Sequence, residues 1–151
     1  MGNQNSILLV EDREEDVFLL KYAFNKVEIK NAVHVVQDGQ QAIDYLAGTG
    51  SFSDRMQFPL PILVLLDLQL PHKPGLEVLA WIRQQPGLKS LIVIILSSSV
   101  HKGDVRDAYQ SGANAFLIKP AGAETLADMC KALKHFWLVH NQPPVETLLP
   151  P

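Results

Sequence analysis

Short apolar runs alternate with segments of helical periodicity along this chain. Runs of this length match strands that are buried on both faces of a parallel sheet, because crossover helices cover both faces. Alternating strands and helices are typical of an α/β fold with a doubly wound parallel sheet. The pattern predicts five strands, at residues 7–10, 33–36, 62–66, 91–96 and 115–118.

The segments between the runs carry apolar residues at helical spacing. Val17, Leu20, Phe24 and Val27 recur in this way after the first run. Glycines are predicted to end the second and fourth helices, since glycine readily adopts the left-handed conformation found there. The second helix is predicted around residues 42–46 and the fourth around 105–109. The third is predicted at 75–85 and the fifth at about 124–140.

Two segments lie outside this regular pattern. Residues 48–61 are polar and interrupted by glycine and proline, which predicts a long surface loop with a role in function or partner contact. Residues 143–151 contain Pro143, Pro144, Pro150 and Pro151, which exclude a continuous helix. The predicted organisation is one domain over residues 1–142, followed by a proline-rich tail over 143–151.

Composition narrows the classes of function. The chain has 13 basic and 16 acidic residues, a formal net charge of −3, so a basic nucleic-acid-binding surface is disfavoured. No apolar stretch approaches the ~20 residues needed to cross a bilayer, and no signal peptide is recognisable. A single cysteine, Cys130, suits a reducing compartment. A cytoplasmic protein without membrane or nucleic-acid contact is therefore expected.

Chemically reactive side chains follow four of the five predicted strands. Glu11 and Asp12 follow the first strand, Asp67 the third, Ser97 the fourth and Lys119 the fifth. The carboxyl ends of parallel strands lie at one edge of the sheet, where ligand sites form. Three crowded carboxylates repel one another unless a cation or shared protons offset their charge. A hard divalent cation such as Mg²⁺ is the predicted ligand.

These residues and their neighbours resemble the response-regulator receiver family. The resemblance covers residues 6 to about 140. Its motifs are Val-Glu-Asp at 10–12, Leu-Leu-Asp-Leu-Gln-Leu-Pro at 65–71, Pro-Gly at 74–75, Leu-Ser at 96–97 and Phe-Leu-Ile-Lys-Pro at 116–120. The resemblance implies a flavodoxin-like fold with strand order 2-1-3-4-5. It also implies phosphorylation by a histidine kinase and output through protein contact.

The resemblance also implies a role for each matching residue. Asp67 would be the phosphoacceptor, and Mg²⁺ would be held by Glu11, Asp12, Asp67 and the backbone carbonyl of Gln69. Ser97 would bind a phosphoryl oxygen, and Lys119 would pair with Asp67 and later with the phosphate. Phe116 would be the aromatic switch residue that moves with Ser97. The family has a cis peptide at the position between Lys119 and Pro120, tolerable for X-Pro at roughly 0.5–1 kcal/mol.

Two alternative functions carry less support. A Mg²⁺-dependent phosphatase with an aspartyl nucleophile places a second aspartate two residues after the first, whereas Gln69 stands there. A structural adaptor with this fold would not need Asp67, Ser97 and Lys119 together. Receivers modulate dephosphorylation through the positions of Gln69 and Ser99. The protein itself would catalyse only its own phosphorylation and dephosphorylation.

The end of the last predicted helix carries the adjacent residues Phe136, Trp137 and Leu138. Neighbouring side chains on an α-helix point ~100° apart, so a helix buried on one face leaves Phe136 or Trp137 exposed. This predicts a homodimer through the fourth helix, fifth strand and fifth helix, with both aromatic residues in the interface. The loop at 48–61 and this ending look like the small regulators paired with cyanobacterial phytochromes.

Overall fold

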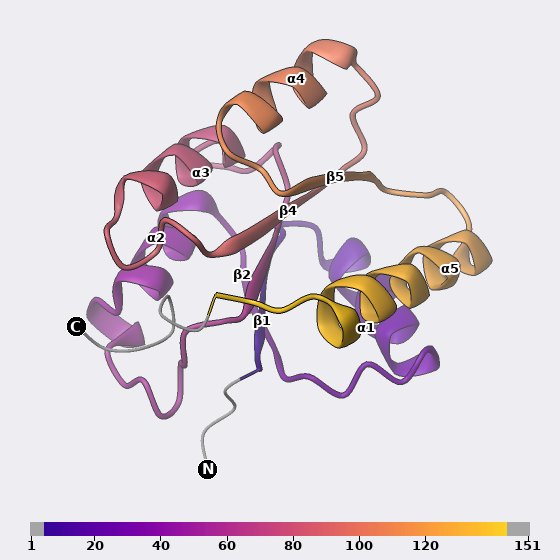
Figure 1. Ribbon diagram of the computed structural model, residues 1–151, viewed down its shortest axis with the longest axis horizontal. Helices are drawn as coiled ribbons and strands as arrows, with labels where there is room; N and C mark the ends of the chain where they lie inside the picture. Colours follow the sequence, from indigo (N-terminus) through magenta and orange to yellow (C-terminus); the bar gives the residue numbers. More distant parts are fainter. Residues whose placement is uncertain (1–4, 145–151) are drawn as a thin grey trace.

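The computed structural model describes residues 5–144 and shows a central parallel sheet covered by helices on both faces (Figure 1). The strand order is β2-β1-β3-β4-β5, which confirms the predicted doubly wound topology. The predicted third and fourth strands each begin one residue too early. The strands are β1 (Ile7–Val10), β2 (Val33–Val36), β3 (Leu63–Leu66), β4 (Ile92–Ser97) and β5 (Ala115–Ile118).

The five α-helices of residues 5–144 form the two outer layers (Figure 1). Helices α1 (Glu14–Lys26) and α5 (Ala123–Leu133) cover one face of the sheet, and α5 continues as a π-helix, η2 (Lys134–His140). Helices α2 (Gly39–Ala47), α3 (Gly75–Gln84) and α4 (Lys102–Gln110) cover the other face. None of the helices within residues 5–144 is long and apolar enough to span a membrane.

The core forms because successive residues of each strand point to opposite faces of the sheet. In β1, Leu8 and Val10 pack with the layer of α2, α3 and α4, whereas Ile7 and Leu9 pack with the layer of α1 and α5. Every residue of β1, β3 and β4 is buried. A strand with two buried faces requires an apolar side chain at every position, which explains the uninterrupted apolar runs.

Local signals fix the ends of α2. The Asp38 carboxylate accepts a hydrogen bond of 2.8 Å from the backbone N–H of Gln41 and so caps the first turn. At the other end Gly48 has φ of 71°, in the left-handed region, as predicted for a helix-terminating glycine. These signals therefore define where the loop at residues 48–61 begins.

The loop at residues 48–61, predicted as a long surface loop, is anchored to the domain by aromatic and arginine side chains. Phe52 and Phe58 pack against the core around Tyr45, with ring centroids 5.3 and 5.9 Å from the Tyr45 ring. The Arg55 guanidinium donates hydrogen bonds of 2.7 Å to the carbonyls of Tyr45 and Leu46. The prediction missed this anchoring because two isolated aromatic residues produce no period. Met56 remains 78% exposed.

The two adjacent aromatic residues of the π-helix η2, Phe136 and Trp137, differ in how far they are buried. Phe136 is 57% exposed, whereas Trp137 is half-buried and packs against the core beside α1 and α5. The N–H of Asn141 donates to the carbonyl of Phe136 at 2.7 Å, the five-residue spacing of a π-helix. The expectation that one aromatic residue is exposed is confirmed. The predicted tail lies outside the described residues from residue 145 onward.

Candidate functional site

The parallel register brings the first acids together at one edge of the sheet. Val10 pairs with Leu66, so Glu11 and Asp67, the residues that follow them, are neighbours. The N–H of Asp67 donates to the carbonyl of Val10 at 3.2 Å, and the N–H of Glu11 donates to the carbonyl of Val36 at 3.0 Å. Both acids are nearly buried, with 3% of Glu11 and 6% of Asp67 exposed.

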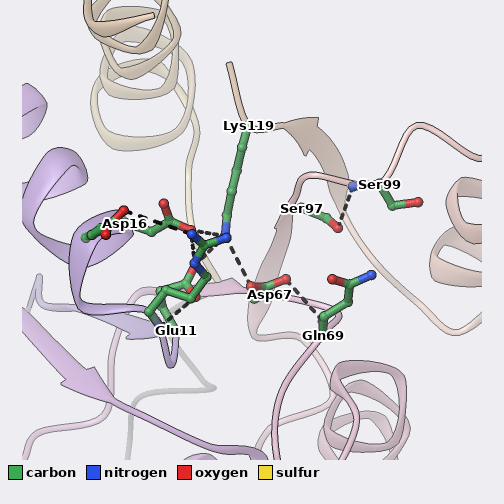
Figure 2. A network of polar contacts seen from close by, with 9 residues as sticks. Glu11, Asp16, Asp67, Gln69, Ser97, Ser99 and Lys119 are labelled. Carbon is green, nitrogen blue, oxygen red and sulfur yellow. Dashed lines mark hydrogen bonds and ion pairs between the residues drawn. The ribbon is translucent and has the colours of Figure 1, made fainter. Parts of the chain in front are cut away.

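Lys119 reaches into this acid cluster from the end of β5 (Figure 2). Its ammonium donates hydrogen bonds to the carboxylates of Glu11, Asp16 and Asp67, at 3.0 Å to Asp16 and 3.1 Å to Asp67. The backbone fixes its position, because the N–H of Lys119 donates to the carbonyl of Ser97 at 2.8 Å. The predicted pairing of Lys119 with Asp67 is therefore present.

Opposite effects act on the pKa values in this cluster. Burial lowers the pKa of Lys119, but its hydrogen bonds to Glu11 and Asp16 and the charge of Asp67 outweigh burial and raise that pKa. The pKa of Glu11 is raised by burial and by the charge of Asp67, which the hydrogen bond from Lys119 opposes. The lysine therefore stays protonated while it offsets the negative charge around Asp67.

Three carboxylates form an oxygen-rich set suited to a divalent cation. Glu11, Asp12 and Asp67 each offer one oxygen, and these oxygens lie within 4.8 Å of one another. The Asp12 side chain is exposed to solvent, whereas Glu11 and Asp67 are buried. Magnesium prefers oxygen ligands and keeps several waters, so few protein ligands on a partly open site fit it. These are the three carboxylates of the predicted set, whose fourth member, the backbone carbonyl of Gln69, stays a prediction.

The turn after β3 holds Asp67 in place. The N–H of Gln69 donates to the Asp67 carboxylate at 3.1 Å, and Figure 2 shows the Gln69 side chain beside that of Asp67. Gly75 begins α3 against the backbone of this turn. A Cβ at Gly75 would lie 2.3 Å from the carbonyl oxygen of Asp67, so only glycine allows this approach.

Ser97 and Phe116 lie on adjacent strands beside the acid cluster. Ser97 is fully buried, and its hydroxyl accepts a hydrogen bond of 3.2 Å from the N–H of Ser99. Phe116 lies opposite Ile95 in the register of β4 and β5, where it is partly buried against the core. The predicted switch residues therefore occupy neighbouring strands, while their movement remains a prediction.

Asp16 belongs to the cluster although the sequence analysis did not select it. Its carboxylate lies in the first turn of α1 and accepts from Lys119. Asp12 and Asp16 are four residues apart, the spacing of neighbours on a helix, but Asp12 precedes the helix. Three consecutive acids at 14–16 stand in the first turn of α1, where the helix dipole favours any negative charge, so the sequence alone does not single out Asp16.

The prediction of a cis peptide between Lys119 and Pro120 is wrong. No cis peptide bond occurs in residues 5–144, so this bond is trans. An X-Pro bond favours trans by roughly 0.5–1 kcal/mol unless its surroundings select cis. The hydrogen bond between the Lys119 N–H and Ser97 is made in the trans form.

A five-stranded sheet in this order, with three acids, a lysine and a hydroxyl at its carboxyl edge, defines a receiver site. The sequence matches the family model of the response regulator receiver domain over residues 7–131. The chain thus belongs to the response-regulator receiver family, whose members accept a phosphoryl group on aspartate from histidine kinases.

Known regulators resemble the chain over most of its length. The probable methanogenesis regulatory protein FilR2 of Methanothrix harundinacea is 36% identical, covering 91% of this chain and 86% of FilR2. The response regulator Rcp1 of Synechocystis is also 36% identical, and the alignment covers 87% of this chain and 88% of Rcp1. The Mn²⁺-bound structure of Rcp1 aligns with this chain with a TM-score of 0.83. The phosphorylated cyanobacterial phytochrome response regulator RcpA is 35% identical, with a TM-score of 0.85 over 93% of this chain and 98% of RcpA. The similarity to phytochrome response regulators is therefore confirmed.

Replacing Lys119 with methionine should destabilise the protein and increase its response to Mg²⁺. Lys119→Met leaves buried acids without their cation, so the free energy of unfolding in EDTA should fall by roughly 3 kcal/mol, near the lower end for a broken buried ion pair. Mg²⁺ should then raise the melting temperature of the variant more than that of the wild type, because it replaces the missing positive charge. Calorimetry with and without Mg²⁺ measures both effects.

Exposed Lys89 provides the matched control, since Lys89→Met removes the same charge away from the site. It should leave both the stability and the Mg²⁺ response unchanged. An equal Mg²⁺ response of wild type and Lys119→Met would show that Lys119 does not offset the charge of the acids.

Proposed function

We propose that Asp67 is the phosphoacceptor of this receiver. The contact that carries the proposal is the 3.1 Å hydrogen bond from the Lys119 ammonium to the Asp67 carboxylate. A carboxylate approaches a phosphoryl donor poorly because both are negative, and a protonated lysine at the nucleophile reduces that repulsion. In the reaction an Asp67 oxygen bonds to phosphorus while the bond from phosphorus to the imidazole nitrogen of a phosphohistidine breaks. The leaving imidazole then takes up a proton.

Glu11, Asp12 and Asp67 would hold Mg²⁺ in this proposal, together with the backbone carbonyl of Gln69. When bound, Mg²⁺ adds positive charge beside the oxygens of the transferring group. The protein's own side chains supply the other interactions. Lys119 stabilises negative charge, and Ser97 donates its hydroxyl proton to a phosphoryl oxygen. The Mn²⁺-bound structure of the relative Rcp1 supports a divalent cation as the ligand of such a site.

The arrangement supports phosphoryl acceptance better than phosphatase activity towards free substrates. An aspartyl phosphatase of this kind places a second aspartate two residues after its nucleophile to protonate the leaving group. Two residues after Asp67 stands Gln69, which has no ionisable side chain and lies beside the nucleophile (Figure 2). We therefore propose self-phosphorylation and self-dephosphorylation as the only chemistry of the site.

Incubation with acetyl phosphate and Mg²⁺ should add one phosphoryl group to the wild-type protein. Asp67→Asn removes the nucleophilic carboxylate and should abolish the addition, and EDTA should do the same by removing the cation. Intact mass spectrometry measures the modification directly. Asp107→Asn alters an exposed acid on α4 and should be labelled like the wild type. Labelling of Asp67→Asn at the wild-type rate would overturn the assignment.

We propose that the donor is a phytochrome-type histidine kinase and that both proteins act in the cytoplasm. The resemblance to RcpA and Rcp1 supports this class of partner. Exposed apolar residues on α1 offer a surface for the contact, with Phe18 67% and Tyr22 58% exposed. The two residues are four apart on α1 and therefore share a face of the helix, and the same helix carries Asp16 of the acid cluster in its first turn.

An autophosphorylated cyanobacterial phytochrome should transfer its phosphoryl group to this chain. The double variant Phe18→Ser/Tyr22→Ser should receive it about tenfold more slowly, because aromatic residues commonly anchor protein interfaces. Acetyl-phosphate labelling should stay unchanged, since it needs no protein contact. Met56→Ser, which alters an exposed residue on the loop at 48–61, is the control. Equal slowing with both donors would mean that the double variant has damaged the site itself.

We also propose a homodimer through α4, β5 and α5, with Phe136 and Trp137 in or beside the interface. Phe136 and Val139 are 57% and 56% exposed on η2, and Tyr109 of α4 and Ile118 of β5 are about half exposed. Exposed large apolar side chains mark interfaces when they gather in patches. Trp137 packs on the core and its ring contacts that of Phe136, so it would hold Phe136 in position beside the interface rather than form the centre of the contact.

Replacing Phe136 with serine should shift a dimer towards monomers. Loss of one exposed aromatic anchor should weaken self-association about tenfold, because such residues commonly contribute 1 kcal/mol or more. Analytical ultracentrifugation over a micromolar concentration range gives the dissociation constant. Phe18→Ser removes an equally exposed aromatic residue on α1 and should leave it unchanged. A wild-type chain that stays monomeric with and without phosphorylation would defeat the proposal.

A further inference from the structure

Both buried carboxylates of the acid cluster already have a hydrogen-bond partner on each of their oxygens. In Glu11, Oε1 accepts from the Lys119 ammonium and Oε2 accepts from the N–H of Arg13 at 3.2 Å. In Asp67, Oδ2 accepts from Lys119 and Oδ1 accepts from the N–H of Gln69. A cation held by these carboxylates would therefore lie close to the ammonium, and the two positive charges would repel each other.

Asp16 differs from the other two carboxylates that bind Lys119. Within the described part of the chain, it alone of the three lies outside the oxygen set of Glu11, Asp12 and Asp67. Its Oδ2 accepts from the ammonium at 3.0 Å, and Figure 2 shows Lys119 between Asp16 on one side and Asp67 on the other. Asp16 can therefore keep its hydrogen bond to Lys119 when the other two carboxylates turn to a cation.

The surroundings of Asp16 favour a charged carboxylate that stays with Lys119. Asp16 lies in the first turn of α1, where the helix dipole stabilises negative charge. Its side chain is 27% exposed, so the charge keeps part of its hydration. The guanidinium of Arg13 lies 4.0 Å away on a largely exposed side chain, which makes it a weak competitor for Asp16.

No neighbouring side chain could replace Asp16 in this contact. A small cavity lies beside the Asp16–Lys119 pair, between α1, α5 and the ends of the strands. Its lining consists of Glu11, Asp16 and Lys119, and otherwise of leucine and proline side chains. On this side of the ammonium, Asp16 is thus the one acceptor side chain in the lining that a cation would not also use.

We infer that Asp16 is a positioning residue that holds the Lys119 ammonium while Glu11 and Asp67 bind the cation, and that it thereby favours metal binding. Without Asp16, the ammonium has only metal-binding carboxylates as partners and competes with the cation for them. Asp16 contacts neither the cation nor the phosphoryl group and acts through Lys119. The inference rests on the proposed function, because it assumes that the acid cluster holds a divalent cation.

The test is the affinity for Mg²⁺ without a phosphodonor, measured by isothermal titration calorimetry. Asp16→Asn keeps the shape of the side chain but removes its charge, so Mg²⁺ should bind about tenfold more weakly, the order expected for one hydrogen bond between charged groups. In the Lys119→Met background the same change should alter the affinity by no more than about twofold, because the competing ammonium is already gone. Asp16→Glu keeps the carboxylate and should bind Mg²⁺ nearly as tightly as the wild type.

Glu15→Gln is the matched control, since it removes the same charge from the same turn of α1 at a side chain that is 85% exposed. It should leave the Mg²⁺ affinity unchanged. Equal affinities of the wild type and Asp16→Asn would overturn the inference. Equal weakening by Glu15→Gln, or by Asp16→Asn in the Lys119→Met background, would also overturn it, because loss of charge alone would then explain the effect. A wild type that binds no Mg²⁺ would instead reject the cation site of the proposed function.

Discussion

The charge balance between Lys119 and the acids around it is the interaction on which the site depends. Two nearly buried carboxylates, Glu11 and Asp67, lie side by side at the carboxyl ends of β1 and β3. Burying such charges is tolerable only when an opposite charge and hydrogen bonds accompany them. One ammonium group supplies both, since it touches Glu11, Asp16 and Asp67 together. The same ammonium places positive charge beside the Asp67 carboxylate, where the incoming phosphoryl group would bring negative charge.

The backbone explains why this lysine can reach three acids. Glu11 and Asp67 are neighbours because β1 and β3 are paired in register, and Lys119 is fixed by its backbone bond to Ser97. Each of these placements uses the hydrogen bonds that hold the sheet together. The positions of Glu11 and Asp67 are therefore set by the pairing of the core strands below them. Gly75 lets α3 begin directly against the carbonyl of Asp67.

The sequence predicts the features that depend on local patterning. The five strands and the acid cluster follow from uninterrupted apolar runs with reactive residues at their ends, and the structure brings Glu11, Asp12, Asp67 and Lys119 together. The strand order comes from the resemblance to the receiver family, and the structure confirms it. Features that depend on distant contacts were not predictable in this way. Asp16 joins the cluster through a lysine 103 residues away, and Arg55 anchors its loop through carbonyls of α2. Neither contact leaves a period or a motif in the sequence.

The strands of the sheet are buried to different extents, which affects the direction in which a structural change at Asp67 would spread. Strands β1, β3 and β4 are buried throughout, whereas no residue of β5 is fully buried and Ile118 is about half exposed. The residue that follows β5 is Lys119, and the residue that pairs with Ile118 is Ser97. A local opening needs least free energy where few apolar contacts must break. A rearrangement around Asp67 would therefore meet the least resistance towards β5 and the first turn of α4, and the most towards the buried strands.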